Sequence, residues 1–486
     1  MKTKRDPLTL IFRKAGALFL LIVFFSIWRS ANAATVAPTQ ILTSGTNVSH
    51  RFGSAIALDG DTLVVGAPLS DRHSVRYSGE AYIFVRSGGT WVLEQVLLPP
   101  IVEPFWVFGR FVAISGDTVV ICHGAYADQT YVYVRSTNGW VLEQTLEVRG
   151  TTAAIDGDTI LIGSKDGDIL NWNDGGVAYI FVRNNGTWTL QQTLTPDDSS
   201  AKDDFGVSVA LNGNTAVISA LGDSDLTDES GRAYVFVRQD TNWIQTQKLR
   251  ANDPQRGALF GWSIALKDDL LAIGAQGNPD QGYTNAGSAY VFARIAGTWV
   301  QQQKLCASNS GPRDGFGYSI ALNTNQLVIG QFDEAYPSVD QIPSGAAYVF
   351  TNSSGSWIAQ VKLAPNEGQL GDLFGAAVAS HGDSIVVGDP SDSGSAYIYE
   401  LLIPSGGGVL SVSQFKRSVS IRNTPPTVSL SFASDFSRSY TVQSTDSIHP
   451  ASFWQTVTNL VGNGSTLTVP INPAVPRQFY RVLLNQ

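Results

Sequence analysis

The sequence predicts an all-β protein: a seven-bladed β-propeller followed by a small β-sandwich. The main observation is one recurring unit, because self-similarity at a fixed period of tens of residues is typical of repeat folds. Seven openings recur at spacings of 56, 41, 56, 55, 56 and 58 residues, so the second unit is short. They begin at Phe52, Phe108, Arg149, Phe205, Phe260, Phe316 and Phe374. The third opening is a degenerate copy of the other six.

Each unit reads as four short strands, a to d. Strand a is an alternating run such as Ser208–Leu211, and an Asx-Gly-type pair such as Asn212-Gly213 follows it. Such pairs favour a two-residue hairpin in which both central residues have positive φ. Strand b is apolar throughout, strand c is an Ala-Tyr-(Val/Ile)-Phe run such as Ala233–Arg238, and strand d begins at a tryptophan such as Trp243. Six tryptophans at one position indicate packing rather than a cofactor stack.

The seventh unit ends at Ala396–Tyr399 without a tryptophan strand. Near the N-terminus, Thr39–Leu42 resembles the strand d segment Gln302–Leu305. We therefore expect the N-terminal strand to complete the last blade and close the ring. Strand alternation then places the short a–b and c–d turns on one face, and the long b–c and d–a loops on the other. Variable loops on a rigid frame are where binding usually occurs, so the loop face is the candidate site.

The repeats resemble a known family. The Phe-Gly openings, the Gly-Ala-Pro at Gly66–Pro68 and the recurring Gly-x-Ala-Tyr-(Val/Ile)-Phe are similar to FG-GAP repeats over roughly residues 38–402. This resemblance implies the seven-bladed propeller of integrin α chains and of many bacterial surface proteins. It also implies a binding role, and it implies no reaction.

Calcium is the cofactor to consider, because integrin-type units hold Ca²⁺ in an Asp-x-Asp-x-Asp-Gly loop between strands a and b. Here that connection is a two-residue hairpin, too short to wrap an ion, so the family site is not carried over. Acidic residues gather instead in the b–c loops of two units. They are Asp166, Asp168, Asn173 and Asp174 in unit three, and Asp223, Asp225, Asp228 and Glu229 in unit four. Ca²⁺ takes six to eight oxygen ligands, so Asp223, Asp225 and Asp228 are the metal candidates; the alternative is that they are solvated loop acids.

Residues 1–33 predict a signal peptide, with a basic start, an apolar run at Ala15–Trp28 and a cut after Ala33. An uncleaved anchor helix is the alternative. We expect a secreted, cell-surface or periplasmic monomer with no transmembrane segment in the mature chain. The chain has 32 basic and 41 acidic residues, and residues 1–33 hold six and one of these, which leaves a net charge of −14 for the remainder. An acidic surface repels nucleic acid and anionic lipid and favours cations or basic partners, so we expect no nucleic-acid partner; the alternative is that the acidic surface serves solubility alone.

The signals for catalysis are weak. Gly206–Ala210 looks faintly like a nucleophile elbow, but such an elbow needs a following helix, and Ser263 and Ser319 repeat the Ser208 position. The five histidines show no metal-ligand spacing. A pair of carboxylates of the glycosidase kind among the loops stays open, since sequence spacing does not expose it. Cys122 and Cys306 lie in units that should be far apart, so we expect two buried free thiols.

Beyond the propeller, predicted over 34–403, lies a glycine-rich linker at 404–408 and then the small β-sandwich at 409–486. The segment Tyr440–Asp446, Trp454 and Phe479–Val482 resembles a C-terminal module common on exported proteins of Verrucomicrobia and Planctomycetes. The sequence as a whole predicts a non-enzymatic binding or adhesion protein that recognises a protein or polysaccharide through the loop face. The alternative is a secreted hydrolase or lyase that acts on polysaccharide.

Overall fold

The computed structural model consists of two compact units, Ala33–Val409 and a second formed by Met1–Asn32 with Leu410–Gln486. In the first unit the structure describes residues 36–45, 50–71, 75–124, 128–167, 175–198, 203–222, 229–280, 282–308, 310–332, 345–353, 355–365, 372–391 and 394–401. In the second it describes the backbone of seven strands. The described residues contain no helix of the length and hydrophobicity that a bilayer crossing requires.

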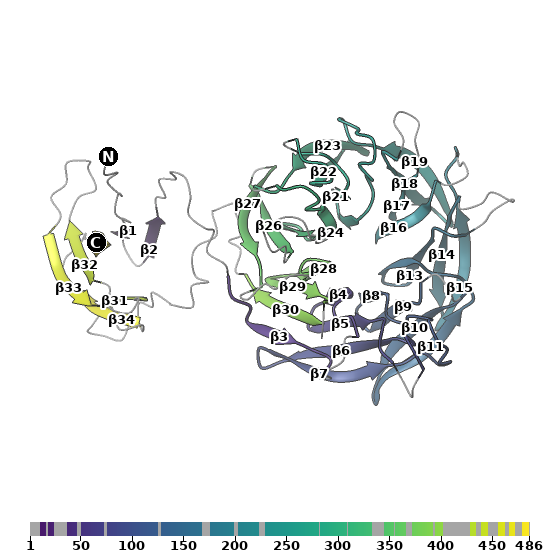
Figure 1. Cartoon of the computed structure of the whole chain (residues 1–486), viewed down its shortest axis with the longest axis horizontal. Coiled ribbons are helices and arrows are strands. Elements are labelled where there is room, and N and C mark those ends of the chain that lie inside the picture. Colours follow the sequence, from purple (N-terminus) through teal and green to yellow (C-terminus); the bar gives the residue numbers. More distant parts are fainter. Residues whose placement is uncertain are drawn as a thin grey trace. The chain divides into compact units, whose positions relative to one another are not determined.

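The first unit is a ring of seven four-stranded antiparallel sheets, as the repeat predicts (Figure 1). Strand a of each blade faces the centre of the ring, and strand d forms its outer wall. In the order a to d, the blades are β4 (Ala55–Asp59), β5 (Thr62–Ala67), β6 (Glu80–Ser87) and β7 (Thr90–Leu97) for blade 1; β8 (Phe111–Ser115), β9 (Thr118–Cys122), β10 (Thr130–Ser136) and β11 (Gly139–Leu146) for blade 2; β12 (Thr152–Asp156), β13 (Thr159–Ser164), β14 (Val177–Asn184) and β15 (Thr187–Leu194) for blade 3; β16 (Phe205–Asn212), β17 (Thr215–Ala220), β18 (Arg232–Gln239) and β19 (Asn242–Leu249) for blade 4; β20 (Ile264–Lys267), β21 (Leu270–Ala275), β22 (Ser288–Ile295) and β23 (Thr298–Leu305) for blade 5; β24 (Phe316–Leu322), β25 (Gln326–Gln331), β26 (Ala346–Ser353) and β27 (Ser356–Leu363) for blade 6; and β28 (Ala377–His381), β29 (Ser384–Asp389), β30 (Ser395–Glu400) and β3 (Gln40–Leu42) for blade 7.

The N-terminal strand closes the ring. Strand β3 pairs antiparallel with β30, with Gln40 opposite Ile398 and Leu42 opposite Ala396. The Thr39 backbone N–H donates to the Ile398 carbonyl at 2.7 Å, and Leu42 is buried between blades 7 and 1. Strand d of the last blade therefore comes from the N-terminal part of the chain. Without β3, strand c of that blade (β30) would lack its outer neighbour.

The Phe-Gly openings join each blade to its predecessor. The six phenylalanines are at most 1% exposed: Phe52, Phe108, Phe205, Phe260, Phe316 and Phe374. The following glycine turns its carbonyl toward strand b of the preceding blade, where a Cβ on Gly66 would lie 1.9 Å from the Gly109 oxygen. Only glycine permits that approach, which explains why a glycine recurs at this position of strand b in five blades: Gly66, Gly163, Gly274, Gly330 and Gly388.

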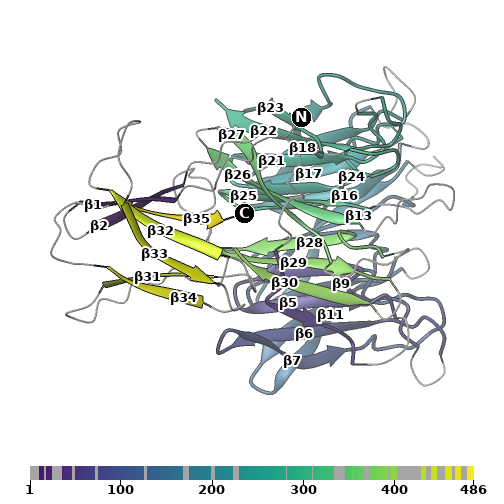
Figure 2. The same ribbon diagram turned by 60° about the vertical axis from the view of Figure 1, so that its left-hand side comes forward.

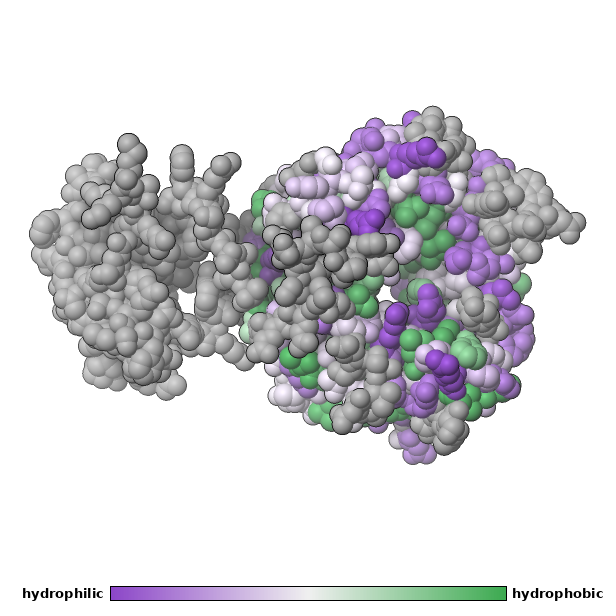
Figure 3. Space-filling view, in the orientation of Figure 1, coloured by the Kyte–Doolittle hydropathy of each residue, from purple (hydrophilic) through white to green (hydrophobic). Residues whose placement is uncertain are grey.

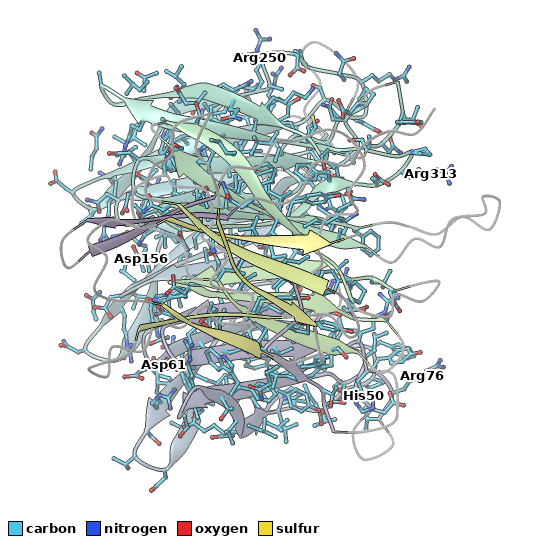
Figure 4. The ribbon with its side chains drawn as sticks, turned by 90° about the vertical axis from the view of Figure 1, so that its left-hand side faces the viewer. His50, Asp61, Arg76, Asp156, Arg250 and Arg313 are labelled. Carbon is cyan, nitrogen blue, oxygen red and sulfur yellow. The ribbon has the colours of Figure 1, made fainter. Side chains whose placement is uncertain are left out.

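The two faces of the ring differ as predicted. Asp61 and Asp156, in a–b turns, lie on one side, and His50, Arg76 and Arg313, in the loops, lie on the other (Figure 4). We call these sides the turn face and the loop face. The predicted turn type, however, is wrong. The pair Asp59–Thr62 ends the ladder, so the central residues are Gly60 and Asp61, and only Gly60 has positive φ (55°). The glycine stands at the first central position, as in a type II′ hairpin.

A repeated contact ties the outer strands together. In strand d a glutamine side chain accepts from the backbone N–H of the next blade's tryptophan and donates to the same residue's carbonyl. Gln247 does so with Trp299 at 2.8 Å for both bonds. The same pairs are Gln40 with Trp91, Gln95 with Trp140, Gln144 with Trp188, Gln192 with Trp243 and Gln303 with Trp357. Between blades 6 and 7 Val361 takes the glutamine position and blade 7 has no tryptophan. The predicted structural role of the six tryptophans is confirmed, since all are 2–3% exposed.

In the second unit, β31 (Val428–Ala433) pairs with β34 (Thr466–Ile471), and β32 (Ser439–Thr445) lies between β33 (Gln455–Val461) and β35 (Phe479–Asn485) (Figure 2). Within the predicted C-terminal domain at 409–486, the described residues thus form five strands. Near the N-terminus β1 (Leu10–Ala15) pairs with β2 (Leu18–Val23). The sandwich packing of the C-terminal sheets and the signal peptide both stay predictions.

Candidate functional site

The turn face uses its polar groups internally. The residue before one blade's a–b turn accepts a hydrogen bond from the next blade's turn. Asp59 Oδ2 accepts from the Gly116 N–H at 2.7 Å, and Asn212 Oδ1 accepts from the Asp268 N–H at 2.8 Å. His381 Nδ1 lies 3.3 Å from Asp59 Oδ1, which continues the series into blade 1. These short, uniform, mutually bonded turns leave the loop face as the more variable surface. Figure 3 views the loop face, where hydrophobic and hydrophilic residues are interspersed around the centre.

The predicted metal ligands Asp223, Asp225 and Asp228 lie outside the described residues, as do Asp168, Asn173 and Asp174. Of the two acidic loops, Asp166 and Glu229 are described. Asp166 Oδ1 binds Lys165 Nζ at 2.7 Å, and the exposed Glu229 accepts from the Leu259 N–H through its backbone carbonyl at 3.2 Å. No group of three or more potential ligands occurs among the residues that the structure describes. The calcium hypothesis therefore still depends on the composition of the b–c loops.

The serines at the elbow-like position contact the neighbouring blade. Ser263 Oγ donates to the Gly317 carbonyl at 2.7 Å, and Ser319 Oγ donates to the Gly375 carbonyl at 2.7 Å. Ser208 differs, since its backbone exchanges bonds with Ser219 Oγ. A hydroxyl committed to a main-chain carbonyl has no base beside it to activate it as a nucleophile. The repeated serine thus positions the Phe-Gly segment of the next blade.

His123 is buried in an aromatic cage. Its ring meets Trp106, Phe108 and Tyr131 edge-on, with centroids 4.9 to 5.5 Å apart, and its Nδ1 lies 3.0 Å from the Trp106 carbonyl. Burial lowers the pKa of His123 to about 4, against the weaker effect of that carbonyl. The neutral ring donates from Nδ1, so its role at neutral pH is to hold the d–a loop between blades 1 and 2.

Two carboxyl groups of the loop face have raised pKa values, and each serves its own loop. Burial raises the pKa of Asp314, whose carboxylate accepts from the Gly311 N–H. Burial likewise raises the pKa of Asp389, which accepts from the Leu373 N–H at 3.0 Å and from Ser391. They belong to different blades, and each accepts hydrogen bonds from the backbone of its own loop.

The thiols are free, as predicted. Burial raises the pKa of Cys122 to about 12, which keeps it protonated and unreactive. The expectation that both are buried is wrong for Cys306, which is only half-buried because it follows the end of β23, where the chain leaves the sheet for the loop face.

Two aromatic clusters of the loop face were not predicted. The first joins the residues that follow the Phe-Gly pairs of blades 5 and 6, where Trp262 and Tyr318 have ring centroids 5.5 Å apart. Phe332 stacks on Tyr318 at 4.4 Å with an interplanar angle of 21°. The equivalent positions in blades 1 and 2 are Ser54 and Arg110, so the repeat does not require aromatic residues here.

The second cluster lies on blade 1 and consists of Arg76, Tyr77 and Phe105. The Arg76 guanidinium lies over the Tyr77 ring, 4.7 Å from its centroid, and the Tyr77 and Phe105 rings meet edge-on at 5.7 Å. Phe105 is 49% exposed. The residues come from two different loops. The spacing of Tyr77 and Phe105 recurs in other blades, but the side chains at those positions differ, so the repeat did not single out this cluster.

A ring of seven four-stranded blades with variable loops gathered on one face is a β-propeller with a binding or scaffold role. Five segments of the chain, 39–84, 188–236, 243–292, 299–350 and 357–399, match the family described as FG-GAP repeat. Together with the seven blades, these matches support an FG-GAP repeat propeller. Residues 85–187, which include the short second unit and most of the degenerate third, are not matched.

No curated protein matches this chain. Among solved structures, one similar chain comes from a crystal structure of the mitotic checkpoint complex, at 12% identity and a TM-score of 0.49, over 79% of this chain and 99% of that one. Another is Sqt1 of Saccharomyces cerevisiae, at 12% identity and a TM-score of 0.42, over 77% of this chain and 100% of that one.

Proposed function

We propose that this protein is an exported, non-enzymatic binding or adhesion module that recognises a protein or glycan at the cell surface through its loop face. The observation that carries the proposal is the contrast between the faces. The turn face bonds to itself from blade to blade, whereas the loop face carries the long, divergent segments and the two aromatic clusters. Divergent loops and exposed aromatic side chains on a rigid frame favour recognition.

The competing function is a secreted hydrolase or lyase that acts on polysaccharide. Such an enzyme needs convergent carboxylates with matched pKa values. Among the described residues, the two loop-face carboxyl groups with raised pKa values, Asp314 and Asp389, each accept hydrogen bonds from the backbone of their own loop. The binding function is therefore the better supported of the two.

The test is a pull-down of envelope and matrix components on the purified protein, with and without Ca²⁺. It is followed by exchange of two loops of the loop face, at 222–231 and 196–204, for short Gly/Ser turns. We expect the exchange to lower affinity for at least one captured component, and charge reversal at Asp61 and Asp158 on the turn face to leave it unchanged. The opposite pattern would place the site on the turn face. Turnover of any polymer in a polysaccharide screen would refute the non-enzymatic role.

A further inference from the structure

Arg76, Tyr77 and Phe105, here called the blade 1 platform, form a rigid exposed surface. The backbone N–H of Phe105 donates to the Arg76 carbonyl at 2.9 Å, and the N–H of Val107 donates to the Tyr77 carbonyl at 3.0 Å, so the two loops run as a short ladder. Asp71 Oδ1 accepts from the Tyr77 N–H at 2.8 Å. Arg76 Nη2 donates to the Tyr77 hydroxyl at 3.0 Å, which orients the guanidinium. The platform is therefore held in one arrangement before any ligand arrives.

The repeat supplies an internal comparison. Tyr77 and Phe105 both have positive φ, at 55° and 66°. The same ladder recurs between blades 5 and 6, where Asn285 and Arg313 stand at these two positions with φ of 56° and 68°. Between blades 4 and 5 the two positions are Glu229 and Gly257, with φ of 54° and 69°.

Asparagine and glycine are the residues that this backbone tolerates best, whereas bulky aromatic residues with positive φ are uncommon and strained. The fold thus needs the backbone turn but not the rings. Tyr77 is half-buried and Phe105 is exposed, so the strain retained at these two aromatic positions favours a function for the side chains themselves.

The charge of the platform is opposite to that of most of the propeller. No carboxylate among the described residues pairs with Arg76, which is exposed and carries its charge toward solvent (Figure 4). The acidic loops at 222–231 and 196–204, with four acidic residues each, belong to blade 4 and the junction before it, on the far side of the ring from blade 1 (Figure 1). At physiological salt, charges farther apart than about 8 Å are largely screened, so the acidic loops of blade 4 act only weakly on a ligand at blade 1. The acidic group close to the platform is Asp71, whose carboxylate is bonded to the Tyr77 N–H at 2.8 Å.

We propose that the blade 1 platform binds a uronate residue of an acidic polysaccharide. The exposed Phe105 ring and the Tyr77 edge offer an apolar surface for the C–H face of a sugar ring, and the Arg76 fork offers paired N–H donors to its carboxylate. Guanidinium–carboxylate pairs of this kind are charge-assisted and directional. This proposal rests on the binding function above and narrows its ligand to a carboxylated glycan.

The probe is polygalacturonate, with its fully methyl-esterified form as the matched neutral polymer, titrated by calorimetry against the full-length protein. We expect binding to polygalacturonate that weakens with added salt, and at least tenfold weaker binding to the ester. The replacements Tyr77→Asn and Phe105→Gly copy residues found at the same positions in other blades. The double variant should keep or raise the Tm while losing at least tenfold in affinity. Arg76→Gln should bind both polymers alike, and Arg313→Gly, at the equivalent position of the loop before blade 6, should bind as the parent does.

Three results would overturn the proposal: no binding of polygalacturonate by the parent, equal binding of the acid and the ester, or unchanged affinity in the Tyr77→Asn/Phe105→Gly variant. None of these results would refute the broader binding function, which is tested separately by the loop exchange at 222–231 and 196–204. If that exchange lowers affinity for a captured component while the platform variant binds polygalacturonate like the parent, the module binds a ligand elsewhere on the loop face.

Discussion

The closure of the ring can be tested with a single side chain. Gln40 is the one member of the glutamine–tryptophan series that comes from β3, and it makes two bonds to Trp91, at 2.7 and 2.8 Å. Each bond contributes a net of about 0.5 to 1.5 kcal/mol, so Gln40→Ala should lower the free energy of unfolding by about 2 kcal/mol. For a propeller of this size that corresponds to a fall in Tm of about 2 to 3 °C.

The assay is urea and thermal unfolding of three variants. Gln247→Ala removes the same two bonds in the middle of the chain, where both blades are covalently continuous, and should cost a similar amount. Gln302→Ala removes an exposed neighbour on strand d whose only side-chain bond is local, to the Val300 carbonyl, and should change stability by less than about 0.5 kcal/mol. Amide exchange of β3 should accelerate in Gln40→Ala alone, because β3 is held to blade 7 by its pairing with β30 and not by a hairpin connection.

Two results would refute this reasoning. If Gln40→Ala and Gln247→Ala both behave like Gln302→Ala, the paired bonds do not hold the blades together. If Gln247→Ala is destabilised and Gln40→Ala is not, β3 does not close the ring in solution as it does in the structure.

Three further predictions concern pH, packing and metal. The folded-state pKa of His123 lies at about 4, below its unfolded value of about 6.5, so its contribution to the free energy of unfolding is complete above pH 6.5 and declines as pH falls toward 4. Between pH 7.5 and pH 4.5 the parent should therefore lose about 2 to 3 kcal/mol of stability that His123→Gln does not lose. Parallel pH profiles of the two proteins in urea unfolding would contradict this. Gly66→Ala places a Cβ 1.9 Å from the Gly109 oxygen and should lower the free energy of unfolding by more than about 3 kcal/mol. Gly60→Ala has open space around the new Cβ and only a positive φ to oppose it, so it should lower that free energy by about 1 kcal/mol. Equal Tm values for the two variants would refute the packing argument. Any Ca²⁺ binding seen by calorimetry should disappear in Asp225→Ala/Asp228→Ala, and if it persists in that variant the ion lies elsewhere.

Much of the fold could be read from the repeat because blades are built from local pattern. The Phe-Gly openings, the apolar strand b and the absence of a tryptophan strand after Tyr399 together predict seven blades and the use of Thr39–Leu42 as the closing strand. The glutamine series also left a trace, since Gln95 and its counterparts lie four residues after a tryptophan in five units. What the sequence did not indicate is that each glutamine bonds the tryptophan of the next blade rather than its own.

The tertiary structure alone decided the turn geometry and the candidate site. The Asx-Gly pairs predict two positive φ values, but the strand register moves the glycine to the first central position, and register depends on the whole sheet. Arg76 and Phe105 are 29 residues apart on two loops. The backbone ladder between these loops recurs in other blades, but its side chains differ from blade to blade, so the repeat does not predict that this charge and this ring meet. The sequence by itself determined which segments become strands and how many blades they form, because hydrophobic period and glycine placement are local. Which loop residues become neighbours depended on the closed ring, because only blade-to-blade packing brings one blade's b–c loop against the d–a loop that follows it.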